Sequence, residues 1–278
     1  MTFALLALLG ATSWGVGDFL AGLASRRAHV LTVLVGSQAV GLVGAAAWVL
    51  IGGGSPPGLD DLLPAVGAGV AGAVGLAALY RGLAIGAMGV VAPISAASPI
   101  VPLAVDLANG IVPTGLQWTG IAVVLCGIVL LAREPRGKAG ATLAAGVVLA
   151  LVAALGFGLF VVGLDAASDG GVAWAIVAAR AASTLLALVG VLVATAPLRP
   201  PANLVPAVVA VGAFDTLANV LVAFATTRGP AGVVAVLSAL YPVATVVLAR
   251  VVLAERLDAT RRTGGALALA GAAVVALG

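Results

Sequence analysis

Residues 143–162 read LAAGVVLALVAALGFGLFVV, an apolar run without a charged or hydroxyl side chain. An α-helix rises about 1.5 Å per residue, so about 20 residues cross the roughly 30 Å hydrocarbon core of a bilayer. A shorter run, Ile121–Ala132, has the same character, and similar stretches recur along the chain. The pattern predicts transmembrane helices.

The overall composition excludes a soluble protein. Hydrophobic residues make up 63% of the 278 residues and charged residues only 8%, and the mean hydropathy is +1.26. Soluble domains carry about 25% charged residues, because their surface faces water. A transmembrane β-barrel would alternate apolar and polar residues instead of collecting them in long runs. We therefore predict an all-α integral membrane protein that crosses the cell membrane many times, with the lipid bilayer as its surroundings.

About ten apolar stretches of helix length are separated by short breaks rich in Gly, Pro or charged residues. The clearest breaks are Gly52–Gly58 (GGGSPPG), Arg133–Lys138 (REPRGK) and Ala196–Pro201 (APLRPP). We predict transmembrane helices at 3–24, 30–50, 62–85, 90–108, 114–132, 140–163, 171–194, 203–227, 231–252 and 262–277.

An internal repeat relates the two halves of the chain. Residues 89–99, GVVAPISAASP, match residues 232–242, GVVAVLSALYP, at an offset of 143. Gly120 matches Gly264 at an offset of 144, and an upstream glycine pattern matches at an offset of 141, which aligns Gly15 with Gly156. Chance similarity between Gly- and Ala-rich segments is the alternative explanation. A small drift around one offset is typical of a duplication, and it predicts two repeats, 1–135 and 136–278.

Each predicted repeat contains five helices. Because five is odd, the second copy must enter the membrane from the opposite face, which makes the pair an inverted repeat. The loops after the odd-numbered helices, with the adjoining helix ends, hold 11 of the 13 Lys and Arg residues, whereas the other loops hold only Arg228. The positive-inside rule then places the odd loops in the cytoplasm and both termini outside.

Polar side chains inside the predicted helices are costly in lipid, so each is a candidate for function. Trp14 and Asp18 lie one turn apart on the first helix. The prolines of Ser98-Pro99 and Tyr241-Pro242 occupy matching positions of the two repeats. They predict helix breaks beside a binding site, with ordinary kinks as the alternative. The candidate cavity residues are Trp14, Asp18, Tyr80, Ser95, Ser98, Arg180, Asp215, Asn219, Ser238 and Tyr241.

Charged residues fall within the first, seventh and eighth predicted helices. Arginine stays protonated, so Arg180 needs a partner, a water-filled cavity or a route to the interface. A structural ion pair with Asp215, a substrate-facing role for either residue, and snorkelling of Arg180 are the alternatives. Asp18 and Asp215 are candidate proton carriers, and a purely local hydrogen-bonding role is the alternative for Asp18.

The chain offers little material for other classes of function. It has one histidine, His29, beside Arg26 and Arg27, and one cysteine, Cys126, in an apolar run. We therefore predict no metal site, no cofactor and no enzymatic activity. The sequence has no Gly-x-x-x-x-Gly-Lys motif, which argues against direct use of ATP. The net charge of +3 includes no basic block, which argues against nucleic-acid binding.

Several short motifs resemble a known family. Trp14-Gly15, Ser98-Pro99, Tyr241-Pro242 and the turn 254–257 (AERL) followed by Gly264 are similar to those of EamA-type, ten-helix members of the drug/metabolite transporter (DMT) superfamily. The resemblance covers essentially the whole chain and implies a secondary transporter with a cavity between its halves. It also implies that helices one, three, four, six, eight and nine line this cavity, and that helices five and ten support it from outside.

These observations together predict a permease or exporter of a small metabolite or drug-like solute that works by alternating access. An amino acid or a toxic compound is the expected kind of substrate, and export is favoured over import. The alternative is a non-transporting membrane scaffold or subunit, whose intramembrane polar residues only fix helix packing. An intramembrane enzyme and a channel fit the sequence less well.

Overall fold

The computed structural model describes residues 1–52, 55–85, 94–132, 143–253 and 258–278. Within these ranges the regular structure is helical, and seven segments are long and apolar enough to cross a membrane. The predicted all-α membrane fold is therefore confirmed. The helices are α1 (Thr2–Ser25), α2 (Val30–Gly52), α3 (Leu59–Ile85), α5 (Ile100–Ala108), α6 (Gly115–Ala132), α7 (Leu143–Ser168), α8 (Val172–Val193), the short 3₁₀ helix η1 (Ala202–Leu204), α9 (Val205–Thr226), α10 (Ala231–Ser238), α11 (Tyr241–Val252) and α12 (Ala259–Leu277).

Local sequence explains where two of the helices begin. At the start of α6, the Thr114 hydroxyl accepts a hydrogen bond from the Gln117 N–H at 3.1 Å, and the Gln117 side-chain oxygen accepts from the Thr114 N–H at 3.0 Å. At the start of α12, the Asp258 carboxylate accepts from the Arg261 N–H at 2.8 Å. These side chains bind backbone groups that lack partners within the helix.

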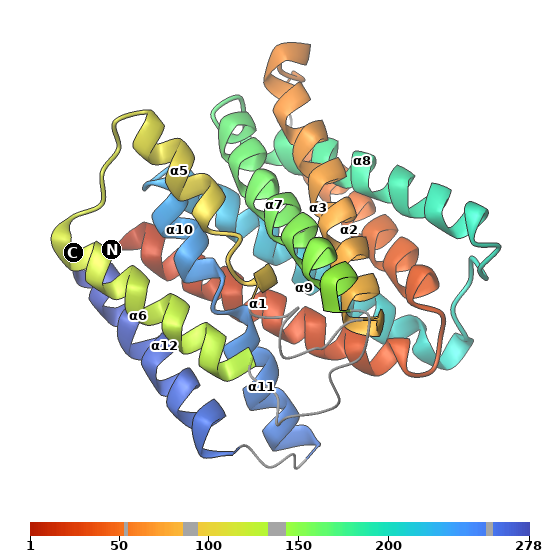
Figure 1. Ribbon diagram of the computed structural model, residues 1–278. Coiled ribbons are helices and arrows are strands. Elements are labelled where there is room, and N and C mark those ends of the chain that lie inside the picture. Colours follow the sequence, from red (N-terminus) through yellow and green to blue (C-terminus); the bar gives the residue numbers. More distant parts are fainter. Residues whose placement is uncertain (53–54, 86–93, 133–142, 254–257) are drawn as a thin grey trace.

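The two halves are inverted relative to each other. α6 and α12 hold equivalent places in the two repeats, and they pack side by side (Figure 1). A Cβ atom at Gly120 would lie 2.9 Å from the Gly271 carbonyl oxygen, and one at Gly264 would lie 2.8 Å from the Gly127 carbonyl oxygen. The start of α6 thus meets the end of α12, so these equivalent helices are antiparallel. The predicted offset of 144 relates the two contacts to each other.

The same inverted relation holds for the other helix pairs. Extensive interfaces pair α3 with α7, α1 with α9 and α2 with α8, and each joins one half to the other. A Cβ at Gly15 would lie 2.6 Å from the Tyr241 carbonyl oxygen, and one at Gly158 would lie 2.7 Å from the Ser98 carbonyl oxygen. Gly15 therefore corresponds to Gly158, at an offset of 143. The alignment of Gly15 with Gly156 is wrong, because Gly-x-Gly patterns match themselves when shifted by two residues.

The fourth helix of the second repeat is broken. The predicted helix 231–252 is divided into α10 and α11 at Ala239 and Leu240, directly before Tyr241-Pro242. In the first repeat, α5 begins directly after Ser98-Pro99. The predicted breaks are confirmed at both positions. The upstream part of the first-repeat helix, residues 86–93, lies outside the described residues.

Two other sequence predictions also fall on segments outside the described residues. Residues 133–142 contain the boundary between the repeats 1–135 and 136–278, and residues 254–257 form the turn that resembles the family motif. The two termini lie at the same end of the bundle (Figure 1). Arg26 and Arg27, at the end of α1, lie at the other end. Which of these ends faces the cytoplasm remains a prediction.

Candidate functional site

A cavity of about 520 Å³ lies where the two halves meet. Its walls come from α1, α2, α3 and the turn before α5 in the first half and from α7, α8, α9, α10 and the start of α11 in the second half. α6 and α12 contribute none of the described lining residues, which agrees with the supporting role implied by the family resemblance. α2 and α8 do line the cavity, which corrects the expectation that it is formed without them. Small-molecule pockets have volumes of about 300–1,000 Å³.

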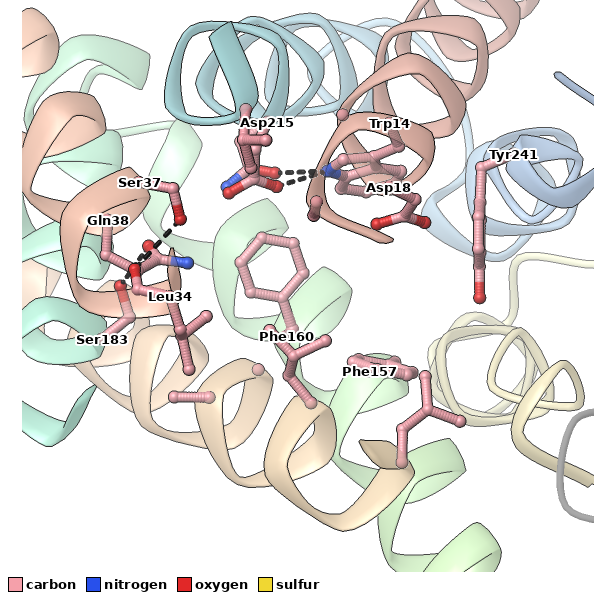
Figure 2. Close-up of a pocket in the computed structure, with 18 of the residues that line it drawn as sticks. Trp14, Asp18, Leu34, Ser37, Gln38, Phe157, Phe160, Ser183, Asp215 and Tyr241 are labelled. Carbon is pink, nitrogen blue, oxygen red and sulfur yellow. Dashed lines mark hydrogen bonds between the residues drawn. The ribbon is translucent and has the colours of Figure 1, made fainter. Parts of the chain in front are cut away.

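Hydrogen bonds link four helices along one wall of the cavity, and Figure 2 shows the bonds that Trp14 donates near Asp215. The Trp14 indole N–H donates to one Asp215 carboxylate oxygen at 3.1 Å and to the Asn219 side-chain oxygen at 3.0 Å. The other Asp215 oxygen accepts from Arg180 Nη1 at 2.6 Å, which forms an ion pair. Arg180 Nη1 also donates to Gln38 Oε1 at 2.5 Å. α1, α2, α8 and α9 are therefore tied together around Asp215.

The two members of the ion pair differ in exposure. The Arg180 side chain is 3% exposed, whereas 28% of the Asp215 side chain is exposed. A Cβ at Gly41 would lie 3.3 Å from Arg180 Nε, and Gly41 is not part of the cavity wall. The guanidinium group thus packs against α2, while Asp215 faces the cavity.

Asp18 extends into the same cavity from α1. Its side chain is exposed although it lies well inside the helix, because the cavity adjoins it. Figure 2 places the Asp18 carboxylate between Trp14 and Tyr241. The Trp14 ring centroid lies 6.4 Å from that of Phe160 and 6.5 Å from that of Tyr241. The cavity therefore presents a carboxylate beside an aromatic wall.

The cavity extends toward one end of the bundle and is closed at the other. Its lining reaches Ser25 and Val30, at the turn between α1 and α2. In the opposite direction, every residue of α10 is buried. The Asp106 carboxylate of α5 accepts a hydrogen bond from the Gly232 N–H at 2.7 Å, and this contact is buried. α5 and α10 thus close the end of the bundle at which the termini lie.

The structure brings together most of the residues that the sequence singled out. Ser95 is buried outside the cavity lining, and the side chain of Tyr80 lies outside the described residues. The predicted residues that line the cavity are Trp14, Asp18, Ser98, Arg180, Asp215, Asn219, Ser238 and Tyr241.

The list of candidate cavity residues left out other residues of the cavity wall. Gln38 of α2 and Ser183 of α8 both line the cavity, and the Ser183 hydroxyl donates to Gln38 Oε1 at 3.0 Å. Their polarity within apolar helices was an available signal. Phe157 and Phe160 of α7 also line the cavity. Phe157 corresponds to Trp14 at the offset of 143, a relation that the incorrect offset of 141 conceals.

Comparison with known proteins identifies the family. The model of the EamA-like transporter family matches residues 1–133 and, separately, residues 144–277. No curated protein matches the chain. A solved structure titled only "Crystal structure of protein" has a TM-score of 0.82 at 18% sequence identity, covering 99% of this chain and 96% of the other, which supports the fold alone. The chain belongs to the EamA-like transporter family, and it is thus a membrane transporter of small solutes and not a member of an enzyme family.

Proposed function

We propose that this protein is a secondary transporter that moves its solute by alternating access. The observation that carries the proposal is the position of the cavity, which lies between two inverted halves, extends toward one end of the bundle and is closed at the other. A carrier of this kind needs one site that two conformations expose to opposite faces of the membrane. Because the two halves are inverted copies, each half can adopt the local structure that the other half has now. This exchange gives a second conformation that is open to the opposite face of the membrane.

In the conformation described, α5 and α10 form the closed end. The second conformation would open this end and close the end near Ser25 and Val30. The hydrogen bond between Asp106 and the Gly232 N–H would then break, because it joins the two helices that must separate. The solute would remain near the helix breaks while the halves rock around it.

We propose that the cavity residues singled out from the sequence contact the solute, and that Asp18 is the better candidate for carrying a proton. Both carboxylate oxygens of Asp215 already accept hydrogen bonds, from Trp14 and from Arg180. No hydrogen bond or ion pair joins Asp18 to another described residue. Asp18 is therefore free to bind a proton or a solute group.

Solute flux into reconstituted vesicles tests the transport proposal. Ala73 of α3 lines the cavity, so Ala73→Phe should fill part of it and abolish flux. Val70 lies on the same helix, is 43% exposed and does not line the cavity, so Val70→Phe is the matched control and should leave flux unchanged. Melting curves would verify that both variants fold. Absence of flux for a broad panel of solutes, under both proton and ion gradients, would contradict the proposal.

A non-transporting scaffold is the alternative, and the partly buried ion pair between Arg180 and Asp215 is the observation that favours it. In a scaffold the pair would serve only to fix α8 against α9. If the protein is only a scaffold, vesicles that contain the wild-type protein should show no solute flux, and vesicles that contain Ala73→Phe should not differ from them.

A further inference from the structure

We propose that the cavity selects organic cations, and that the Asp18 carboxylate binds their positive charge. The inference rests on the proposed transport function and names the substrate class of the same site. It follows from the balance of charge in the cavity wall, from the position of the only arginine described there, and from the aromatic rings around Asp18.

The balance of charge leaves Asp18 uncompensated. In the described part of the chain, the charged residues that line the cavity are Asp18, Arg180 and Asp215. Arg180 and Asp215 neutralise each other at a distance of 2.6 Å. Asp18 forms no hydrogen bond or ion pair with another described residue. The described lining of the cavity, when ionised, therefore carries one net negative charge, which attracts a positively charged group.

Arg180 is poorly placed to bind an anionic solute. Its side chain is 3% exposed, and its Nη1 already donates to Asp215 and Gln38. Its Nε and Nη2 atoms are buried without a partner among the described residues, and Nε lies beside Gly41, outside the cavity wall. An anion would have to approach Asp215 and displace it from the guanidinium group. Repulsion from Asp215 and the cost of breaking the buried pair both oppose that exchange.

Aromatic rings around Asp18 favour a cation with an apolar body. Trp14 and Tyr241 flank the carboxylate, and Phe160 packs near Trp14 (Figure 2). The faces of such rings attract cations, and the attraction grows when the cation leaves water. An ammonium group could therefore contact Asp18 while its hydrocarbon part lies against the rings. The cavity volume of about 520 Å³ is large enough for a drug-sized body of this kind.

A proton and an organic cation would compete for Asp18, because each neutralises the same carboxylate. Cation binding should therefore weaken as the pH falls. Among the described residues that line the cavity, the other ionisable groups are Asp215 of α9 and Arg180 of α8, which form the ion pair, and Tyr241 of α11. The described cavity residues of α2 and α10 are uncharged. Asp18 is thus the group expected to set this pH dependence.

The first experiment measures ligand-dependent melting of the purified wild-type protein with three probes of similar size. The probes are benzyltrimethylammonium, the neutral N-benzylacetamide and the anionic phenylacetate. A ligand that binds only the folded state raises the melting temperature in a concentration-dependent way. We expect the cation to do so at concentrations at least about tenfold lower than the other two probes. Equal effects of the three probes, or no effect of the cation, would overturn the inference.

The second experiment removes the charge of Asp18. Asp18→Asn should weaken cation binding at least about tenfold and remove its pH dependence. Asp60→Asn, at an exposed carboxylate in the first turn of α3, is the matched control and should change neither. Asp18→Glu keeps the charge and should keep the preference for cations, which provides a test if Asp18→Asn does not fold. Unchanged cation binding in a folded Asp18→Asn variant would overturn the inference.

Counterflow in vesicles separates this inference from the transport proposal. Cation flux that disappears in Asp18→Asn would support both. Flux of neutral or anionic solutes alone would overturn the cation inference and leave the transport proposal intact. Cation-specific melting shifts without flux of any solute would contradict the transport proposal and retain the binding specificity of Asp18.

Discussion

Removal of the Asp215 charge should destabilise the protein more than removal of the Arg180 charge. Asp215→Asn preserves the shape of the side chain but removes the negative charge that lies 2.6 Å from Arg180 Nη1. Arg180, which is 3% exposed, would then keep its positive charge with only neutral acceptors nearby. Loss of one partner from a buried ion pair costs about 3–5 kcal/mol, and we expect a loss of stability in this range.

Removal of the Arg180 charge should cost less stability, because the Asp215 charge that remains is partly exposed to the cavity. Arg180→Met retains much of the side-chain volume and leaves Asp215 unpaired. Asp215 is 28% exposed to the cavity, and the Trp14 N–H would still donate to it. We therefore expect a smaller loss, of about 1–3 kcal/mol. In the double variant neither charge remains, and replacement of a whole buried pair by neutral groups is often nearly neutral. The double variant should thus be more stable than Asp215→Asn alone.

Unfolding in mixed micelles with increasing SDS, followed by tryptophan fluorescence, would give the free energies for this double-mutant cycle. Equal losses in the two single variants, or simple addition of both losses in the double variant, would refute the reasoning. Ligand-induced stabilisation adds a second readout. Its persistence in the double variant would assign the pair of Arg180 and Asp215 a structural role, and its loss in a folded double variant would assign the pair to the binding site.

The close helix contacts, the closed end and the orientation lead to three further predictions. Gly15→Ala should lower the melting temperature, because its Cβ would lie 2.5 Å from the Ala244 Cβ. Gly22→Ala is the control and should leave the melting temperature unchanged, because a Cβ there would have no atom of another helix within 4 Å. Similar effects of the two variants would argue against tight packing at Gly15. Asp106→Ala should cost about 1–3 kcal/mol in SDS unfolding, because the buried Gly232 N–H loses its acceptor, and Asp106→Asn, which keeps an acceptor oxygen, should cost less. A reporter fused to the C-terminus should report an external location, and a cytoplasmic signal would show that the charge bias gives the wrong orientation.

The fold was predictable because lipid imposes simple requirements on the chain. A long apolar run such as residues 143–162 has to satisfy its backbone groups internally, so it forms a helix. The inversion of the repeats followed from the odd number of helices in each one. The register of the first helix of the repeat was harder to predict. Residues 15–17 and 156–158 share the pattern Gly-x-Gly, so the sequence alone does not show which glycine of one segment corresponds to which of the other. The contacts of Gly15 and Gly158 show that these two residues are equivalent.

The polar part of the site was more predictable than its apolar part. Asp18 and Arg180 stand out in apolar helices, because charges in lipid need an interior surface or a partner. Phe157 and Phe160 do not stand out within residues 143–162 of α7, which are apolar on every side of the helix. Sequence alone cannot tell which face of such a helix turns toward a cavity and which toward lipid. The pairing of Arg180 with Asp215 also depends on the packing of α8 against α9, which hydropathy does not determine.

The duplication places equivalent positions on opposite walls of one cavity, and their chemistry has diverged. At the offset of 143, Trp14 corresponds to Phe157 and Asp18 corresponds to Val161, and all four residues line the cavity. A carboxylate moved from α1 to the equivalent place on α7 should therefore still face a bound cation. We expect Asp18→Val combined with Val161→Asp to regain part of the cation-induced melting shift that Asp18→Val alone loses. A folded double variant without any such shift would contradict this equivalence, and it would show that the carboxylate acts only from its place between Trp14 and Tyr241.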